Sequence, residues 1–163
     1  MELHRNATNI IFEFCDYSNE YHCAKFAELI NHYMADPMGN ATPLSKLQQL
    51  RLLDGMQKHP SSFVLFALAE GEIVGLTTCF INFSTFKVKP YLYIHDVVIE
   101  ANYRGMGVGK KLVQQCIDIA TERKYCKVTL EVREDNGAAK YLYQGLEFRE
   151  CNPTMHYWER EIL

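Results

Sequence analysis

The sequence has no long hydrophobic run and no excess of basic residues, and each absence excludes a class of protein. The longest apolar stretch, residues 63–69, is far shorter than the ~20 residues that span a bilayer. Residues 1–8 lack the apolar core of a signal peptide. With 17 lysines and arginines against 20 acidic residues, no basic surface for nucleic acid is expected. We therefore expect a cytoplasmic protein without a membrane or nucleic-acid partner.

Cysteine pairs at metal-ligand spacing are also missing. No C-x-x-C motif occurs, and no cysteine stands at zinc-finger spacing from a histidine. We expect the cysteines to be small buried hydrophobic side chains in a reducing compartment, and we expect no metal site. Cys116 lies on the apolar face of a predicted helix without an identifiable histidine base, so an inert thiol is expected there. The six residues are Cys15, Cys23, Cys79, Cys116, Cys126 and Cys151.

No repeat and no Gly-, Ser- or Pro-rich linker divides the 163 residues, so one domain over 1–163 is expected. The hydrophobic pattern predicts mixed α/β structure. Helices are predicted at 18–34, capped by Ser18, and at 43–58, with Pro43 in the first turn after Thr42. Further helices are predicted at 107–124 and 137–145, the second capped by Asn136. Strands are predicted at 9–14, 63–69, 73–80, 91–99, 127–133 and 154–158.

A glycine cluster at 103–110 lies between a predicted strand and a predicted helix. Glycines let the backbone approach a ligand, and the free amides of a helix start attract anions such as a pyrophosphate. The spacing fits neither the P-loop nor the dinucleotide-binding motif. It leaves R-x-x-G-x-G, formed by Arg104, Gly107 and Gly109. A plain glycine turn between strand and helix is the alternative interpretation.

A second motif helps to decide between an anion-binding loop and a plain glycine turn. Asn136, Ala139, Leu142 and Tyr143 form N-x-x-A-x-x-L-Y, whose asparagine stands 27 residues after Gly109. Together the two motifs resemble those of the GCN5-related N-acetyltransferases (GNAT), over residues 8–158. The resemblance implies the GNAT fold, in which a mostly antiparallel twisted sheet is splayed between its fourth and fifth strands and flanked by about four helices. It also implies N-acetyltransferase activity with acetyl-CoA.

The resemblance assigns residues to the cofactor. Backbone amides of the glycine loop would bind the pyrophosphate, and residues 97–99 would pair with the pantetheine arm like an added strand. An amide near Val98 would stabilise the developing oxyanion. The cofactor-binding residues implied are Val97, Val98, Ile99, Arg104, Gly105, Met106, Gly107, Val108, Gly109, Lys110, Asn136, Ala139 and Tyr143.

Three residues would carry catalysis. Tyr143 matches the family's tyrosine acid, which would protonate the leaving thiolate, although a core tyrosine is the alternative. His95 and Asp96 are candidates for the group that deprotonates the attacking amine. Alternatively, His95 is a packed strand histidine and Asp96 a structural anchor for nearby amides. Strand alternation puts these two on opposite faces unless a bulge intervenes.

One position departs from the family pattern. Glu147 stands where a glycine usually precedes the phenylalanine. That glycine ends the short helix, so we expect the turn to be built differently, with Gly145 as the candidate.

The acceptor is less well specified. Residues 83–86, Pro90 and 93–98 resemble the diamine (spermidine/spermine) acetyltransferases, with His95 in place of their glutamate. A primary amine such as a polyamine or diamine is therefore expected. An aminoglycoside, an amino acid or a protein amine is the alternative, and so is a non-catalytic acyl-CoA-binding sensor. Four aromatic residues either line an amine channel or form a core or dimer surface: Phe83, Phe86, Tyr91 and Tyr93. Family members are commonly dimers, so a homodimer is expected by analogy.

Overall fold

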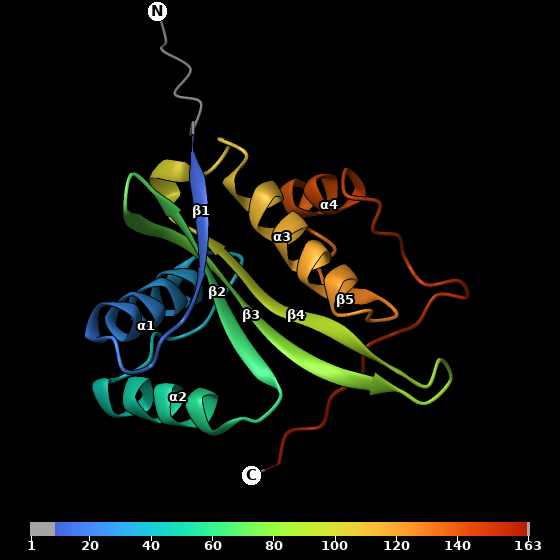
Figure 1. The fold of residues 1–163 in the computed structure, drawn as a ribbon, viewed down its shortest axis with the longest axis horizontal. Coiled ribbons are helices and arrows are strands. Elements are labelled where there is room, and N and C mark those ends of the chain that lie inside the picture. The colour runs from blue at the N-terminus through green and yellow to red at the C-terminus, as the bar shows by residue number, and fades with distance from the viewer. Residues whose placement is uncertain (1–8, 163) are drawn as a thin grey trace, which may run out of the picture.

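The computed structural model describes residues 9–162 (Figure 1). Residues 1–8, on which the expectation about a signal peptide rests, lie outside the described part. No described helix is long and apolar enough to cross a membrane. The described elements are β1 (Ile10–Phe14), α1 (Glu20–Ala35), α2 (Lys46–Lys58), β2 (Ser62–Ala69), β3 (Glu72–Ser84), β4 (Lys89–Ile99), the 3-10 helix η1 (Ala101–Tyr103), α3 (Val108–Glu122), β5 (Val128–Leu130) and α4 (Gly137–Gln144).

The sheet has the order β1-β2-β3-β4-β5. The first four strands pair antiparallel, and β5 pairs parallel to β4. The β4–β5 pairing ends at Ile94 and Leu130, although β4 continues to Ile99. The two strands therefore separate halfway along β4, which confirms the predicted splay. β5 is shorter than the predicted strand at 127–133, because the residues after Leu130 have no partner on β4.

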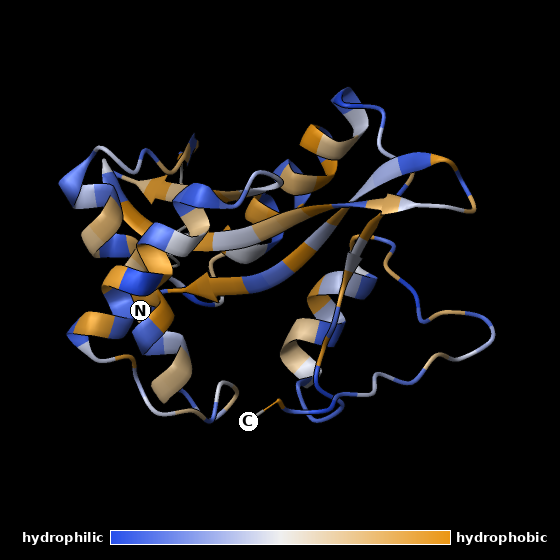
Figure 2. Ribbon diagram, turned by 90° about the horizontal axis from the view of Figure 1, so that it is seen from below, coloured by the Kyte–Doolittle hydropathy of each residue, from blue (hydrophilic) through white to orange (hydrophobic). Residues whose placement is uncertain are grey.

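Helices cover both faces of the sheet. α3 packs on one face, where Leu112 and Cys116 meet Leu92 and Ile94 in a buried cluster. α1 and α2 lie on the other face, where Phe26 and its neighbours meet a second cluster from β2, β3 and β4 (Figure 1). Orange and blue bands alternate along the helices in Figure 2, as expected when each helix turns one apolar side to the sheet. Two cores thus enclose the sheet and hold β4 between them.

The structure corrects two predicted helix starts. Asn19, not Ser18, caps α1 by accepting hydrogen bonds from two amides of the first turn, because Ser18 is bonded to the carboxylate of Asp16. α2 begins at Lys46, after the predicted Thr42 and Pro43. Its cap is Ser45, which forms a capping box with Gln48.

The C-terminal segment and the β3–β4 hairpin also differ from expectation. The strand predicted at 154–158 is absent from the described structure, and Met155, Tyr157 and Trp158 are exposed. The three-residue β5 gives that segment little backbone to pair with. β3 and β4 extend through most of the predicted loop. Phe83 (59% exposed) and Phe86 (98%) project from the hairpin end, so they belong to no core.

Candidate active site

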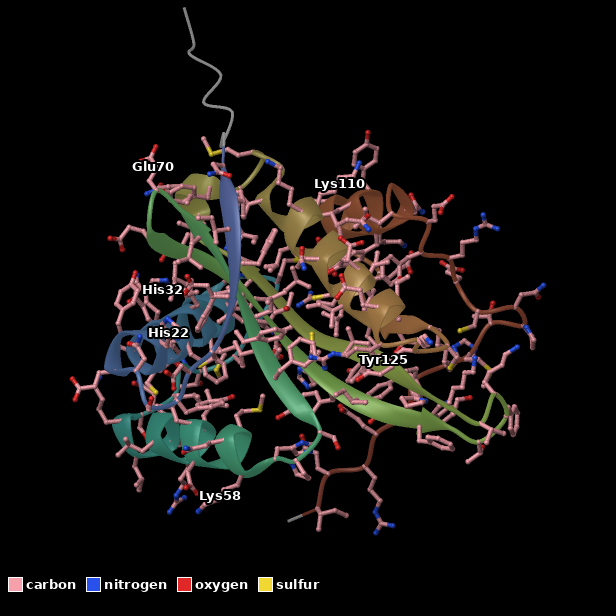
Figure 3. All side chains as sticks on the ribbon, viewed as in Figure 1. His22, His32, Lys58, Glu70, Lys110 and Tyr125 are labelled. Carbon is pink, nitrogen blue, oxygen red and sulfur yellow. The ribbon has the colours of Figure 1, made fainter. Side chains whose placement is uncertain are left out.

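The first turn of α3, just after the glycine loop, presents free backbone donors. Gly107 caps α3 in a left-handed conformation (φ 80°), and no side chain caps that helix end. The first amide to bond back is that of Lys111, which donates to the Gly107 carbonyl at 3.1 Å. Within residues 9–162, nothing accepts a hydrogen bond from the amides of Val108, Gly109 or Lys110. The first turn contains no acid, and Lys110 stands in it (Figure 3). This arrangement suits an anion.

Glycine is required in this loop for two reasons. Gly105 and Gly107 have φ values of 76° and 80°, which side-chain-bearing residues rarely adopt, and the space where a Cβ would stand is open. At Gly109, a Cβ would lie 3.2 Å from Leu142 of α4 and 3.6 Å from Ile99 of β4. Gly109 therefore lets the start of α3 pack against both elements. The free amides at the start of α3 would thus meet the pyrophosphate of acetyl-CoA beside β4 and α4. The residues present therefore fit that cofactor.

β4 turns unpaired backbone groups toward the splay. The amide of Glu100 donates to Val74 on β3, and the carbonyl of Ile99 accepts from Arg104 Nε at 3.0 Å. Since backbone groups alternate along an antiparallel strand, Val97 and Ile99 face the open side and Val98 faces β3. The open amide nearest the expected oxyanion position is therefore that of Val97, one residue before Val98.

A β-bulge brings His95 and Asp96 to the same face of the sheet. Thr78 pairs with Asp96 and Cys79 with Ile94, so His95 is the additional residue. The condition stated for the expectation of opposite faces, that no bulge intervenes, is therefore not met, and the two side chains share a face. His95 Nδ1 lies 3.2 Å from Asp96 Oδ1, and the Thr78 hydroxyl donates to Asp96 Oδ2. The hydrogen bond to Asp96 raises the pKa of His95 above its usual value.

These contacts give each residue of the pair a distinct role. Asp96 is held by the Thr78 hydroxyl rather than by the amides that the alternative named, and it also orients the imidazole. When Nδ1–H donates to Asp96, the Nε2 lone pair remains available to accept a proton. The rings of Phe80 and Tyr93 pack edge-on against His95, each at 5.8 Å between centroids. The imidazole is half exposed, so its Nε2 remains reachable from outside.

Tyr143 lies on α4, beside the α3 core. Its ring packs edge-on against Phe148 at 5.9 Å, and burial raises the pKa of its phenol to about 12, with the nearby Tyr33 adding to the rise. It therefore keeps its proton across the neutral range. Asn136 caps α4 as predicted, since its side chain accepts from the amide of Ala139 at 3.1 Å.

Glu147 itself adopts the conformation that the family's glycine would favour. Its φ is 65°, whereas Gly145 is right-handed at −67°. The turn therefore keeps its left-handed residue, and the expectation that Gly145 replaces it is wrong.

Sequence reasoning named Tyr93 as a possible lining of an amine channel but missed Tyr33 and Glu131, which also lie near the His95–Asp96 pair. Tyr33 of α1 lies near Asp96. Burial raises the pKa of its phenol, and the charge of that carboxylate raises it further. The Tyr93 hydroxyl donates to Glu131, just past β5, at 3.3 Å. No motif could have found these contacts, since they join elements far apart in the chain. A cavity of about 290 Å³ adjoins them, lined by Asn82, Tyr91, Tyr93, Thr129, Leu130, Glu131 and Tyr157.

The side chain of Arg104 is already engaged. Its Nη1 lies 2.9 Å from Asp36 Oδ2, in the connection between α1 and α2, while its Nε is held by Ile99. Three of the five guanidinium N–H groups remain for an anion.

Two clusters of titratable groups lie apart from this arrangement. Cys116 is fully buried as predicted, and its Sγ contacts Thr77 at 3.4 Å and Cys79 at 3.9 Å rather than a histidine. On α1, Glu28 and His32 have donor atoms within 4.8 Å of one another and of Glu100. The ammonium of Lys25 lies 3.1 Å from one of those carboxylates and 3.7 Å from the other, so the chain itself neutralises them.

A model described as the Acetyltransferase (GNAT) family matches residues 26–148. The chain belongs to the GNAT family. Acetyl-CoA is the acetyl donor that this family uses. The match spans both motifs, the splayed strands and the end of α1. It therefore covers every element that places the site described above.

Individual relatives cover less of the GNAT domain. An uncharacterized N-acetyltransferase of Archaeoglobus fulgidus is 33% identical over 87 residues, which is 53% of this chain and 59% of that protein. Thialysine N-epsilon-acetyltransferase of Bos taurus is 28% identical over 74 residues, 45% of this chain and 43% of that protein. The chain thus spans about half the length of these curated relatives.

The fold is shared with solved GNAT-type structures. An aminoglycoside acetyltransferase from an uncultured soil metagenomic sample, in complex with sisomicin, superimposes with a TM-score of 0.76. The alignment covers 94% of this chain and 97% of that one at 21% identity. This likeness establishes the predicted GNAT fold.

Proposed function

We propose that this chain is an acetyl-CoA-dependent N-acetyltransferase that transfers the acetyl group to a primary amine by direct attack in a ternary complex. The observation that carries the proposal is the splay between β4 and β5. On β4 it is bordered by the His95–Asp96 pair and by the open backbone of Val97 and Ile99. The free amides before α3 lie next to it, as does α4 with Tyr143.

The chain's own residues would divide the work. When bound, acetyl-CoA supplies the thioester whose carbonyl carbon is attacked. His95 Nε2 takes a proton from the ammonium, directly or through water, because a protonated amine (pKa ~10) cannot attack. The Val97 amide donates to the developing oxyanion, an interaction typically worth about 3 kcal/mol. As the C–S bond breaks, the Tyr143 hydroxyl gives its proton to the thiolate.

The proposed acceptor class rests on two carboxylates that have no lysine or arginine partner among the described residues. Asp96 and Glu131 lie next to His95, and the described structure places no lysine or arginine within 4 Å of either carboxylate. The neighbouring acids Asp36 and Asp135, by contrast, are paired with arginines. We therefore propose an acceptor with a second cationic group, such as a diamine or polyamine. An aminoglycoside also fits this requirement. An amino acid with a neutral side chain does not fit it, and neither does a protein N-terminus without a second cationic group nearby.

A homodimer of this single catalytic domain is also proposed. Besides the family analogy, it is supported by the exposed apolar end of the β3–β4 hairpin, where Phe83, Phe86 and Val88 are 59%, 98% and 72% exposed. Sedimentation of the wild-type chain and of Phe86→Ser tests this. A dimer that becomes monomeric in the variant is expected, and a monomeric wild type would overturn the assembly.

Free-thiol release from acetyl-CoA, measured across polyamines, aminoglycosides, amino acids and short peptides, tests the function. Thiol release with dicationic amines is expected.

Tyr143→Phe should lower kcat about 100-fold. Tyr141→Phe is the matched control, because this tyrosine is on the same helix but is 82% exposed. Silence with every amine, while acetyl-CoA still raises the Tm, would favour the sensor alternative. Equal loss in both variants would remove Tyr143 from catalysis.

A further inference from the structure

The connection between α1 and α2 is tied to both sides of the splay. Asp36 Oδ2 lies 2.9 Å from Arg104 Nη1, and Arg104 Nε is bonded to the last residue of β4. On the other side, Arg133, just beyond β5, donates to the carbonyls of Met38 at 3.0 Å and Pro37 at 3.3 Å. Since β4 and β5 are parallel, their carboxyl ends lie at one edge of the sheet. The connection therefore bridges the open end of the splay.

This bridge is firmly joined to the end of α1. The amide of Asp36 donates to His32 and Tyr33, and the amide of Ala41 bonds back to Met34 at 2.8 Å. A Cβ on Gly39 would lie only 2.0 Å from the Tyr33 carbonyl oxygen, so the loop folds tightly back on the helix. A displacement of Asp36 must consequently move Tyr33 as well.

Tyr33 in turn lies among the catalytic groups. It packs against the buried cluster that contains Val98 of β4, and burial together with the charge of Asp96 raises the pKa of its phenol. A chain of contacts thus leads from Arg104, in the pyrophosphate loop, through Asp36 to Tyr33 and the reacting end of the site. The contact between Arg104 and Asp36 joins segments that lie far apart in the sequence.

We propose that Asp36 is a positioning residue that couples occupation of the glycine loop before α3 to the placement of the α1–α2 connection at the acceptor site. The inference rests on the proposed function, since it concerns acetyl-CoA and its amine acceptor. An anion held by the loop amides accepts from the N–H groups of Arg104 that Ile99 and Asp36 leave free, and this further partner fixes the guanidinium that holds Asp36. By reciprocity, an acceptor that orders the connection strengthens cofactor binding by the same factor.

Coenzyme A itself is the probe for the test, with amide hydrogen exchange of residues 38–41 as the readout. Coenzyme A should slow this exchange about fivefold or more in the wild type, a typical coupling, and by less than about twofold in Asp36→Asn. Asp54→Asn is the matched control. It removes another acid–base pair (2.7 Å to Lys58) on the adjacent helix, and it should behave as wild type.

Arg133→Lys provides an independent variant should Asp36→Asn fold poorly. It keeps the charge but loses the two-point attachment of Nε and Nη2 to Asp135 (2.9 and 2.7 Å) that leaves Nη1 directed at both carbonyls, and the same loss of protection is expected. With spermidine as the acceptor, the KM for spermidine should rise about tenfold in both variants while kcat changes little, a split that general destabilisation would not produce.

Different results would overturn the coupling through Asp36 and the proposed function on which it rests. Coenzyme A binding by calorimetry with unchanged exchange at 38–41 would overturn the coupling alone. Equal protection in Asp36→Asn and wild type would do the same. No calorimetric binding to the wild type would overturn the proposed function together with the coupling.

Discussion

Glu147 holds a left-handed backbone (φ 65°) at the turn after α4. For a residue with a Cβ this conformation costs about 1–2 kcal/mol, of which glycine would recover part after its own loss of about 0.5–1 kcal/mol in chain entropy. Glu147→Gly should therefore raise the free energy of unfolding by about 0.5–1 kcal/mol. Denaturant titration checks this. Glu150→Gly, at an exposed position without a positive φ, is the control and should be neutral or destabilising.

The bulge at His95 makes the pH dependence of turnover testable. Because the hydrogen bond to Asp96 raises the pKa of His95, and the neutral imidazole is the base, kcat should climb through a limb centred above the usual 6.5. Asp96→Asn removes the negative charge of that hydrogen-bond acceptor, so the limb should move to lower pH. Tyr143, with its pKa raised to about 12, should stay protonated and cause no decline below about pH 10. A limb that stays in place in Asp96→Asn would exclude His95 as the base.

At the scale of elements, β3 and β4 approach closely at Gly75. A Cβ there would lie 2.6 Å from Ile99 Cδ1 and 2.9 Å from the Val98 carbonyl oxygen, and the backbone oxygen cannot yield easily. Gly75→Ala should lower the free energy of unfolding by about 1–3 kcal/mol. Gly55→Ala in α2, where a Cβ meets nothing within 4 Å, should raise it by about 1 kcal/mol. Thermal unfolding of both variants checks the two signs, and destabilisation by Gly55→Ala would contradict the helix argument.

The start of α3 places a cation where the helix dipole disfavours it. Lys110→Glu should therefore stabilise the helix by about 0.3–1 kcal/mol and at the same time weaken coenzyme A binding about tenfold. Lys124→Glu changes the same charge just beyond the other end of α3, so a small destabilisation with unchanged affinity is expected. Calorimetric titration and thermal unfolding give both quantities. Unchanged affinity in Lys110→Glu would remove this side chain from the anion site.

Motifs and periodicity predicted the elements better than their ends. The glycine loop, α3 and the Asn136 cap were predictable because their signals are local. The helix starts expected at Ser18 and Pro43 were wrong because competing caps, Asn19 one residue on and Ser45 two residues on, formed better bonds. The bulge at His95 and the salt bridge from Asp36 to Arg104 had no local signal, since each depends on how strands and loops far apart in the chain meet.

At the scale of the whole molecule, the site exists because two layers of helices hold the ends of β4 and β5 apart. α3 contributes the anion-binding start, α4 the tyrosine, and α1 the connection that bridges the gap. His95, on the α1–α2 face, and Tyr143, beside α3, thus approach the gap from different layers. This arrangement suits an amine that enters from one side and a thiolate that leaves on the other.

The most direct test of acetyl transfer quantifies free coenzyme A and the N-acetylated amine in the same sample by mass spectrometry, together with the mass of the protein. Direct attack in a ternary complex predicts equal amounts of the two products and no acetylated protein intermediate. Coenzyme A release without an acetylated amine, or an acetyl group retained on the protein, would contradict the account.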